Sequence, residues 1–538
     1  MSVAMEFFDA RQADPEQTVT ADICIVGAGA AGIALAREFI GTPFRVALVE
    51  SGDRVFRHRT QFLYKGENKG IANYPITHSR FRMFGGSTTR WGGQCRPLTP
   101  LDFERRDAIP HSGWPFDADH LQPYYDRAQT VCHLGTRDYA PDSWLDRTAN
   151  RLSVPSESLE TRIFQFSHPT DFGQTYCDAL GAAANVEVWL NANVVKVDSC
   201  EPARSVSGIR AASFNGKQLT FKAQFFVLAC GGIETPRLLL SSRDGNPKGL
   251  GNSHDLVGRF FMDHPYFLTG YFDPADPALS RNDFTIEDYD RVGSEQKALA
   301  ALAVKESLLR DRGVNGAALY FERRPDYKTQ PAYFSPPGRS FTHLMNIVTH
   351  SDVPDRHFWR HLRTVLLGID TVGGNLYRQA KEKTKPCPRL GLRTILETTP
   401  NPDSRVTLTD RRDFFGMQRV SVDWRINSRD LEGADLLFEL IRKEFSRLGL
   451  GRLVEDRALN TDGWPQSMTG GKHHMGTTRM HDDRKQGVVD PTCRLHETEN
   501  LFIAGSSLFP TGGYVNPTLT IVALAIRLAD HLKTKLAR

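Results

Sequence analysis

The sequence lacks a hydrophobic run long enough to cross a membrane, and it lacks a recognisable secretion signal. A spanning helix needs ~18 or more apolar residues, whereas the best candidate, Leu519–Ile526, stops at Arg527. Residues 1–22 contain acidic side chains but no basic start, apolar centre or twin-arginine pair of a leader. We therefore expect a cytoplasmic protein without a membrane span.

Cysteine is sparse and widely spaced: the chain has eight among 538 residues, and no two form a CxxC pair. This pattern predicts reduced thiols and excludes a redox-active CxxC disulfide, an in-chain iron–sulfur cluster and a CxxCH haem site. The formal net charge of +4 is small, and the basic residues are dispersed rather than gathered in an arm. Nothing in the charge pattern favours a nucleic-acid partner.

The segment that is most informative lies near the start of the chain. An apolar run at residues 23–26 breaks at Gly27 and resumes as small residues through Gly29 and Gly32. The spacing is that of a strand, a phosphate-binding turn and a helix, with the pyrophosphate on the helix N-terminus. A second apolar run ends at Glu50, where an acidic side chain can bind a ribose hydroxyl. The alternative is an ordinary glycine-rich turn, but this context favours an adenine dinucleotide, NAD or FAD.

The same order of strand, glycine and helix appears twice more. Residues 224–230 form an apolar run that ends in two glycines before a helical pattern, and residues 499–505 lead to a helix that starts at Pro517. Residues 185–197 alternate like one strand, and the runs at 405–409 and 419–424 alternate like a half-exposed antiparallel sheet.

The length exceeds the ~250–300 residues that one core usually supports. The sequence predicts a mixed α/β (α+β) fold with a discontinuous Rossmann-type cofactor domain and a substrate domain that has a mostly antiparallel sheet. We assign residues 18–100, 185–270 and 465–538 to the first domain and residues 101–184 and 271–464 to the second.

Residues 85–93 contain four glycines, with hydroxyl side chains between them. Such a segment cannot pack a core, but its backbone donors can lie against a flat polar ring or a phosphate. The alternative is a mobile loop, and Trp91 with its apolar flank favours a loop that is held in place. This loop is a candidate cofactor contact.

A histidine pair, His473 and His474, precedes the last predicted strand. Adjacent side chains in an extended segment point to opposite sides, and no further His/Cys cluster has ligand spacing, so we predict no metal site. A neutral imidazole near a cofactor suits a general base, because its pKa lies near working pH. The alternative is a structural histidine on a buried strand. Asn516 precedes the last helix, whose N-terminus directs positive potential at a bound group.

At these residues the chain resembles the glucose–methanol–choline (GMC) family of flavin oxidoreductases. The matching motifs are residues 27–32 with Glu50, the glycine loop, residues 227–237 and 404–406, the HxMGT segment from His473, and Asn516-Pro517. The resemblance is strongest to the pyranose oxidase and fructose dehydrogenase branch, including bacterial glycoside 3-oxidases. It implies FAD as cofactor, with His473 as catalytic base and Asn516 as its partner. The cofactor-binding residues that it implies are Gly27, Gly29, Ala30, Gly32, Glu50, Gly85, Gly86, Ser87, Thr88, Trp91, Gly92, Val195, Ala229, Gly505, Asn516, Pro517 and Thr518.

One departure from the family concerns flavin attachment. Pyranose oxidases attach the flavin through a histidine that precedes a tryptophan, whereas this chain has Arg90 before Trp91. An arginine cannot form that link, so we expect non-covalent FAD.

The resemblance implies oxidation of a secondary hydroxyl of a sugar or glycoside to a ketone, with proton transfer to His473 and hydride transfer to flavin N5. The alternatives are an oxidase or dehydrogenase of a non-sugar alcohol in secondary metabolism, an NAD(P)H-linked flavoprotein, which lacks a second nucleotide fingerprint here, and a non-catalytic flavin-binding protein. The electron acceptor would be oxygen, a quinone or a separate protein.

Overall fold

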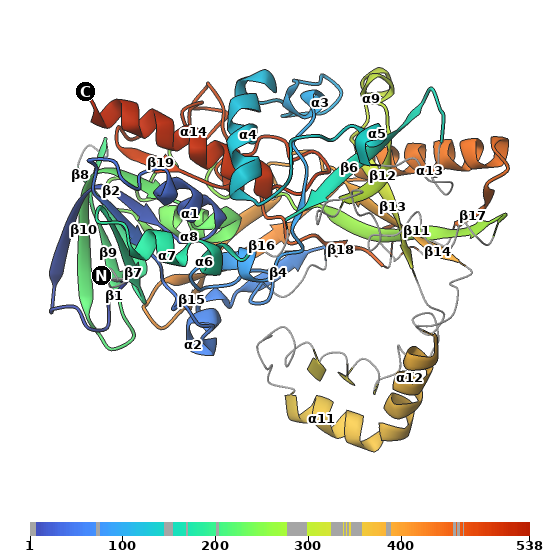
Figure 1. Cartoon of the computed structure of the whole chain (residues 1–538). Helices are drawn as coiled ribbons and strands as arrows, with labels where there is room; N and C mark the ends of the chain where they lie inside the picture. Colours follow the sequence, from blue (N-terminus) through green and yellow to red (C-terminus); the bar gives the residue numbers. More distant parts are fainter. Residues whose placement is uncertain are drawn as a thin grey trace.

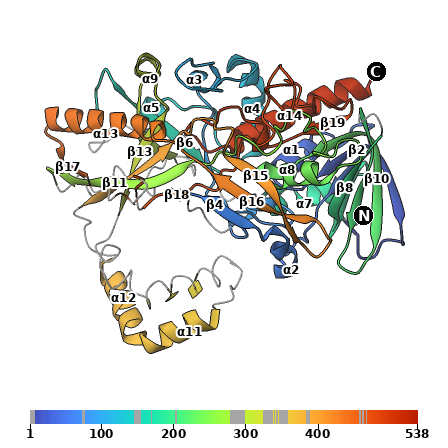
Figure 2. The same cartoon turned by 180° about the vertical axis from the view of Figure 1, so that it is seen from behind.

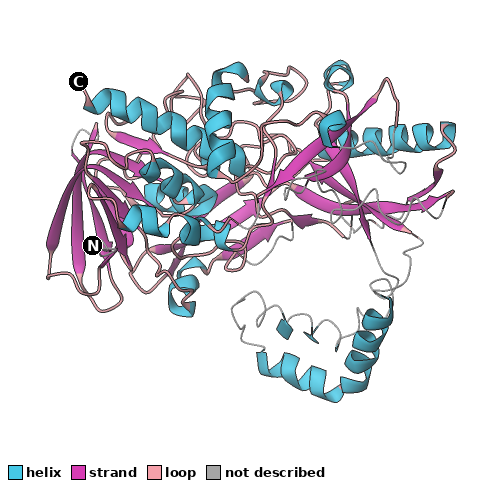
Figure 3. Cartoon of the chain, in the orientation of Figure 1, coloured by secondary structure: helices cyan, strands magenta, loops and turns pink. Residues whose placement is uncertain are grey.

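The computed structural model describes two large sheets, a small third sheet and helices around them (Figures 1 and 3). It describes residues 7–71, 76–144, 154–167, 170–200, 204–276, 298–323, 337, 340–341, 344–345, 358–382, 389–455, 459, 463–465 and 467–538. Within these residues, no helix is both long and apolar enough to cross a membrane.

The first sheet has eight strands and a parallel centre. Its order is β1-β7-β3-β2-β10-β9-β8, and β19 pairs with the C-terminal part of β10. Pairing is parallel from β1 to β10 and onto β19, and antiparallel from β10 through β9 to β8. The strand bounds are β1 Phe7–Asp9, β2 Gln17–Val26, β3 Val46–Val49, β7 Val186–Leu190, β8 Asn193–Cys200, β9 Ser205–Ala212, β10 Gln218–Leu228 and β19 Leu501–Ile503.

The central strands are apolar on both faces because helices cover them, as expected for a parallel sheet. Ile23, Ile25 and Leu48 are fully buried. Helix α1 follows β2 through the first glycine turn, α8 follows β10, and α14 follows β19 and packs against α1 and α4. The bounds are α1 Ala30–Arg37, α4 Gln122–Val131, α8 Gly231–Ser241 and α14 Thr518–Leu536.

The expected single strand at residues 185–197 is two strands, β7 and β8, and this corrects the sequence interpretation. The chain turns between them at Asn191, whose φ is +57°. Asparagine is one of the few residues that adopt this left-handed conformation readily. The alternating pattern continues on both sides of the turn, so periodicity alone does not reveal it.

The second sheet also has eight strands, and all its pairings are antiparallel. The order is β17-β11-β14-β13-β12-β6-β5, with β18 on β11. Helix α13, Arg429–Arg447, covers it through an apolar stripe that includes Leu437, Ile441 and Phe445. The strand bounds are β5 Gln94–Cys95, β6 Leu159–Phe166, β11 Pro265–Pro274, β12 Ala298–Val304, β13 Ala317–Arg323, β14 Leu390–Leu396, β17 Gly451–Glu455 and β18 Thr469–Gly470.

The two alternating runs at 405–409 and 419–424 are strands, but they lie outside that sheet. They form β15, Arg405–Arg412, and β16, Gln418–Trp424, which pair with each other and, through β16, with β4, Glu67–Gly70. This three-stranded sheet lies between the two larger ones (Figures 1 and 2). The expected division into two domains stays a prediction.

The remaining helices are short connections, apart from one pair that projects from the body. Helices α11 and α12 lie apart from both large sheets (Figure 2). The bounds are α2 His58–Gln61, η1 Phe62–Tyr64, η2 Gly86–Thr89, α3 Pro100–Phe103, η3 Asp119–Leu121, α5 Pro141–Trp144, α6 Phe172–Thr175, α7 Cys177–Gly181, α9 Glu306–Arg312, α11 Phe358–Leu367, α12 Ile369–Glu382 and η6 Ser506–Leu508.

Candidate functional site

The first glycine turn joins β2 to α1, and its close contacts explain two of its three glycines. Gly27 has a φ of +102°, and a Cβ there would lie 2.7 Å from the carbonyl oxygen of Ala229. A Cβ on Gly32 would lie 1.8 Å from the carbonyl oxygen of Gly27. Gly29 differs, because a Cβ there would meet open space. The turn therefore packs tightly on its protein side and presents bare backbone on the other.

Glu50 ends β3 beside this turn, as the sequence predicts. Its carboxylate accepts hydrogen bonds from the backbone N–H of Ala28 at 2.9 Å and of Gly52 at 2.7 Å. The Ser51 hydroxyl donates to it at 3.1 Å. Glu50 is 6% exposed, so its charge is stabilised by these donors. The carboxylate thus fixes the glycine turn.

A cavity of about 680 Å³ extends from the glycine turn to His473 and Asn516. Most of the predicted cofactor-binding residues line it: Gly27, Gly29, Ala30, Glu50, Gly86, Ser87, Thr88, Trp91, Gly92, Ala229, Gly505, Asn516, Pro517 and Thr518. Gly32 and Gly85 lie behind the wall as close-packing glycines. Val195 does not line this cavity: it lines a smaller one and Val194 lines the large one, because adjacent residues of strand β8 point to opposite faces.

The second glycine loop lies directly against the first. The N–H of Gly85 donates to the carbonyl of Ala28 at 2.8 Å, and a Cβ on Gly86 would lie 2.9 Å from Gly29 Cα. The loop forms the turn η2, and the indole N–H of Trp91 donates to the carbonyl of Thr170 at 2.9 Å. Two glycine motifs that are far apart in the sequence therefore build one wall of the cavity.

His473 and Asn516 meet at the other end of the cavity. Asn516 Nδ2 lies 3.3 Å from His473 Nε2, while Asn516 Oδ1 is buried without a hydrogen-bond partner. An unpartnered amide oxygen costs free energy unless a ligand or water satisfies it. Both residues line the cavity, so the pair can hold a hydroxyl group between a donor and an acceptor.

A local distortion of an antiparallel pairing presents His473. Met262 pairs with Met475 on one side of the distortion, and Gly471 N–H bonds the carbonyl of His264 on the other. Between these points Lys472 has a φ of +64°. The fully buried carboxylate of Asp263 accepts the N–H of Lys472 at 3.1 Å and that of His473 at 2.8 Å.

Three histidine rings gather at this end, and all are held neutral. Burial, with smaller contributions from His264 and His474, lowers the pKa of His473 well below its ordinary 6.5. Burial also lowers the pKa of His264 to about 4 and that of His474 to about 3. A neutral imidazole has a free lone pair, so His473 is available as a proton acceptor over most of the pH range.

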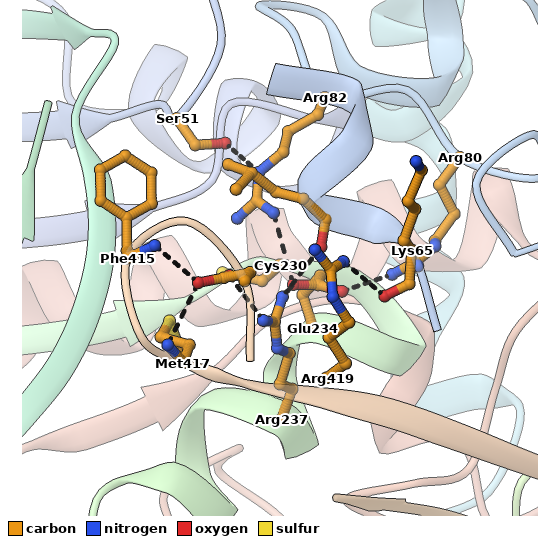
Figure 4. Close-up of polar contacts among 12 residues, drawn as sticks. Ser51, Lys65, Arg80, Arg82, Cys230, Glu234, Arg237, Phe415, Met417 and Arg419 are labelled. Atoms are coloured by element: carbon orange, nitrogen blue, oxygen red, sulfur yellow. Dashed lines mark hydrogen bonds and ion pairs between the residues drawn. The ribbon is translucent and has the colours of Figure 1, made fainter. Parts of the chain in front are cut away.

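A charged cluster that sequence reasoning missed borders the cavity beside the glycine turn (Figure 4). The Glu234 carboxylate lies 2.8 Å from Arg80 and 3.0 Å from Arg237, and Arg82 lies 3.6 Å away. Burial alone would raise the pKa of Glu234, but the guanidinium groups of Arg237, Arg80 and Arg82 outweigh it and lower the pKa to about 2. Arg82 also donates to Ser51 at 2.8 Å, which joins the cluster to the Glu50 side of the glycine turn.

The only sequence signal for this cluster is the i,i+3 spacing of Glu234 and Arg237 on α8. Arg80 and Arg82 come from an aperiodic segment, and nothing in the pattern links them to α8.

Among the residues that the structure describes, no group of three or more His, Cys, Asp or Glu residues could hold a metal ion. Seven described cysteines are free thiols, and five of them are buried.

Comparison with known proteins places these features in one family. Residues 22–249 match the family model described as FAD dependent oxidoreductase, and residues 400–525 match the model described as GMC oxidoreductase. The 6'''-hydroxyparomomycin C oxidase of Streptomyces lividus is 26% identical over 573 aligned positions, which cover 96% of this chain and 92% of that protein. The fructose dehydrogenase large subunit of Gluconobacter japonicus is 24% identical over 96% of this chain and 98% of that protein.

A formate oxidase structure from Aspergillus oryzae shares the fold, with a TM-score of 0.55 and 16% identity over 97% of this chain and 99% of that one. The chain is therefore an FAD-dependent oxidoreductase. It belongs to the GMC family, which confirms the resemblance seen in the motifs. The cavity fits the cofactor on structural grounds, because bare backbone at Gly29 faces open space beside the N-terminus of α1.

Proposed function

We propose that this enzyme oxidises a secondary hydroxyl of a sugar or glycoside to a ketone. The observation that carries the proposal is the convergence of His473 Nε2 and Asn516 Nδ2 at 3.3 Å, at one end of the cavity that begins at the glycine turn. The names of two nearly full-length relatives, a hydroxyparomomycin oxidase and a fructose dehydrogenase, support a sugar-like alcohol. Polar residues that line the cavity, including Gln94 and Lys472, suit a substrate rich in hydroxyl groups.

In this proposal each residue has one task. His473 Nε2 accepts the hydroxyl proton, and Asn516 Nδ2 donates a hydrogen bond to the same oxygen. Bound FAD supplies the acceptor for the hydride that leaves the carbinol carbon. Proton acceptance by a positioned base is worth ~10²–10⁴-fold in rate. The glycine turn and Glu50 would hold the ADP half of FAD, and the loop at 85–93 with the N-terminus of α14 would hold the flavin half.

The test is anaerobic reduction of the bound flavin in a stopped-flow spectrometer with a panel of sugars, glycosides and simple alcohols. We expect sugars or glycosides to bleach the flavin fastest, and a fastest reaction with a non-sugar alcohol contradicts the substrate class. His473→Ala should keep FAD but lose at least ~100-fold in the reduction rate. His254→Ala, at an exposed histidine, is the matched control and should reduce normally. A normal rate in His473→Ala would refute the assignment of the base.

We also propose that FAD is bound without a covalent link. Arg90 lines the cavity beside Trp91, where an attaching histidine would be needed. Acid precipitation should therefore leave the yellow flavin in the supernatant. Flavin that stays with the washed pellet would contradict this proposal.

The electron acceptor is proposed as oxygen, a quinone or a separate protein, and re-oxidation of the reduced enzyme by each distinguishes them.

The two-domain division is proposed with the boundaries given above. It is supported by the two large sheets, one around the glycine turn and one beside the His473 end.

A further inference from the structure

The ring of His473 makes a second contact, on the side away from Asn516. Its Nδ1 lies 2.9 Å from Nδ1 of His264, a fully buried residue that precedes β11. The two rings cross at 76° with their centroids 5.0 Å apart. In a neutral imidazole one nitrogen carries a proton and the other accepts. One ring therefore donates in this contact and the other accepts.

The contact with Asn516, whose amide nitrogen lies toward His473, favours one of the two assignments. Asn516 Nδ2 carries only donor hydrogens, and it lies 3.3 Å from His473 Nε2. His473 Nε2 must therefore be unprotonated to accept that hydrogen bond. The single proton of the neutral ring is then on Nδ1, and it is donated to His264 Nδ1. His264 accepts on Nδ1, so its own proton is on Nε2, which is buried without a hydrogen-bond partner. The nearby backbone of Gly512 and Gly513 favours the protonated ring, although burial outweighs it.

The backbone holds His264 and His473 in a fixed position relative to each other. Asp263 accepts the N–H of His264 at 2.8 Å and the N–H of His473 at 2.8 Å on the same oxygen. Both main-chain segments are thus tied to one carboxylate, which is fully buried. The ring contact does not depend on a flexible loop.

We propose that His264 is a positioning residue that selects the productive tautomer of His473; the inference rests on the proposed function. With the proton held on Nδ1, the Nε2 atom of His473 keeps its lone pair, which accepts from Asn516 Nδ2 before substrate binds. A bound substrate hydroxyl takes the place of Asn516 Nδ2 as donor to that lone pair, and Asn516 Nδ2 then donates to the hydroxyl oxygen. The hydroxyl proton would move to His473 Nε2, and bound FAD would supply the acceptor for the hydride that leaves the carbinol carbon. The substrate becomes a ketone, and the resulting imidazolium keeps its Nδ1–H bond to His264. The opposite tautomer would present an N–H and could not accept a proton.

Two amide substitutions at position 264 distinguish acceptance of the His473 Nδ1–H hydrogen bond from simple packing of a side chain in the same space. In His264→Asn the amide oxygen can occupy the place of Nδ1, so it can accept from His473. In His264→Gln the amide reaches the place of Nε2 instead, although its volume is nearer to that of histidine. We expect His264→Asn to stay within about tenfold of the native flavin-reduction rate. We expect His264→Gln and His264→Leu to lose about 100-fold, the upper end of the roughly 10–100-fold loss that follows removal of a partner that orients a metal-binding histidine.

FAD content and the substrate dissociation constant, read from the dependence of the reduction rate on substrate concentration, should change little in these variants. A packing role predicts the reverse order, with the glutamine variant at least as active as the asparagine variant. That order, or native rates in all three variants, would overturn the proposal.

The tautomer can also be read in the native holoenzyme, without any variant at His264. Histidine labelled with ¹⁵N gives distinct signals for protonated and bare ring nitrogens, and loss of one set in His473→Ala assigns that ring. We expect a protonated Nδ1 and a bare Nε2. The opposite tautomer overturns the proposal even if no variant retains FAD. This measurement needs no substrate, so failure of the proposed oxidation would leave it informative.

Discussion

Replacing Glu234 with glutamine tests whether the charged cluster beside the glycine turn stabilises the fold. The carboxyl group is 9% exposed and lies among Arg80, Arg82 and Arg237. Burial opposes its charge, but the three guanidinium groups lower its pKa from 4.5 to about 2. At about 1.4 kcal/mol for each pH unit, this corresponds to about 3 kcal/mol of stability. The glutamine variant should lose about that much near neutral pH.

The pH dependence gives the sign of the effect. The folded pKa of Glu234 is lowered, so its contribution is fully present above the unfolded value of 4.5 and is lost as the pH falls toward about 2. The difference in unfolding free energy between native protein and variant should therefore shrink by about 1 kcal/mol from pH 5 to pH 3.5. Urea unfolding, followed by tryptophan fluorescence and by release of flavin, measures it.

The control is Glu104→Gln on the surface. Glu104 pairs with Arg310 at 2.7 Å, but the two side chains are 40% and 46% exposed. Exposed pairs contribute up to about 1 kcal/mol, so this variant should be near native. Equal losses in the two variants, or a Glu234 effect below about 1 kcal/mol, would refute the reasoning.

Two further predictions concern the cofactor and the base. Gly29→Val should lower FAD affinity at least about tenfold, because the new side chain enters open space in the cavity wall; FAD titration of the apoprotein measures it, and Gly373→Ala in α12 should bind normally. The rate of flavin reduction should stay level as the pH falls from 8 through 6.5, because burial, His264 and His474 keep the pKa of His473 well below 6.5 and so keep the ring in its base form. A fall in rate centred near pH 6.5 would contradict this.

Local patterns predicted the cofactor side of the molecule well. A buried strand, three spaced glycines and a small-residue helix leave few alternatives, because two of the glycines are required by close backbone contacts and the third leaves space for a ligand. Gly27 and Gly32 show this directly, since a Cβ on either would meet backbone atoms below 3 Å. Strand breaks were harder to predict. The turn at Asn191 interrupts an alternating pattern without changing it, so the pattern of residues 185–197 predicts one strand where the structure has two.

Partners that are distant in the sequence could not be predicted in the same way. His473 and Asn516 were proposed from motifs, but His264 lies 209 residues from the ring that it contacts. Arg80 lies 154 residues from Glu234. Periodicity reports which face of an element is buried, and it carries no information about which buried groups meet. These pairs are fixed only by the way the sheets are brought together.

Asp263 shows why the proposed base, His473, depends on a residue that is distant in the sequence. In this protein the imidazole that faces the cavity lies on backbone that has left regular pairing, which leaves N–H groups inside the protein without strand partners. Unpaired, each would cost about 1–3 kcal/mol. A buried carboxylate can accept several of them at once, and those donors offset the cost of burying its charge. The donors that Asp263 accepts include the N–H groups of His264, Lys472 and His473. The same carboxylate that permits the distortion therefore aligns the base with its neighbouring ring.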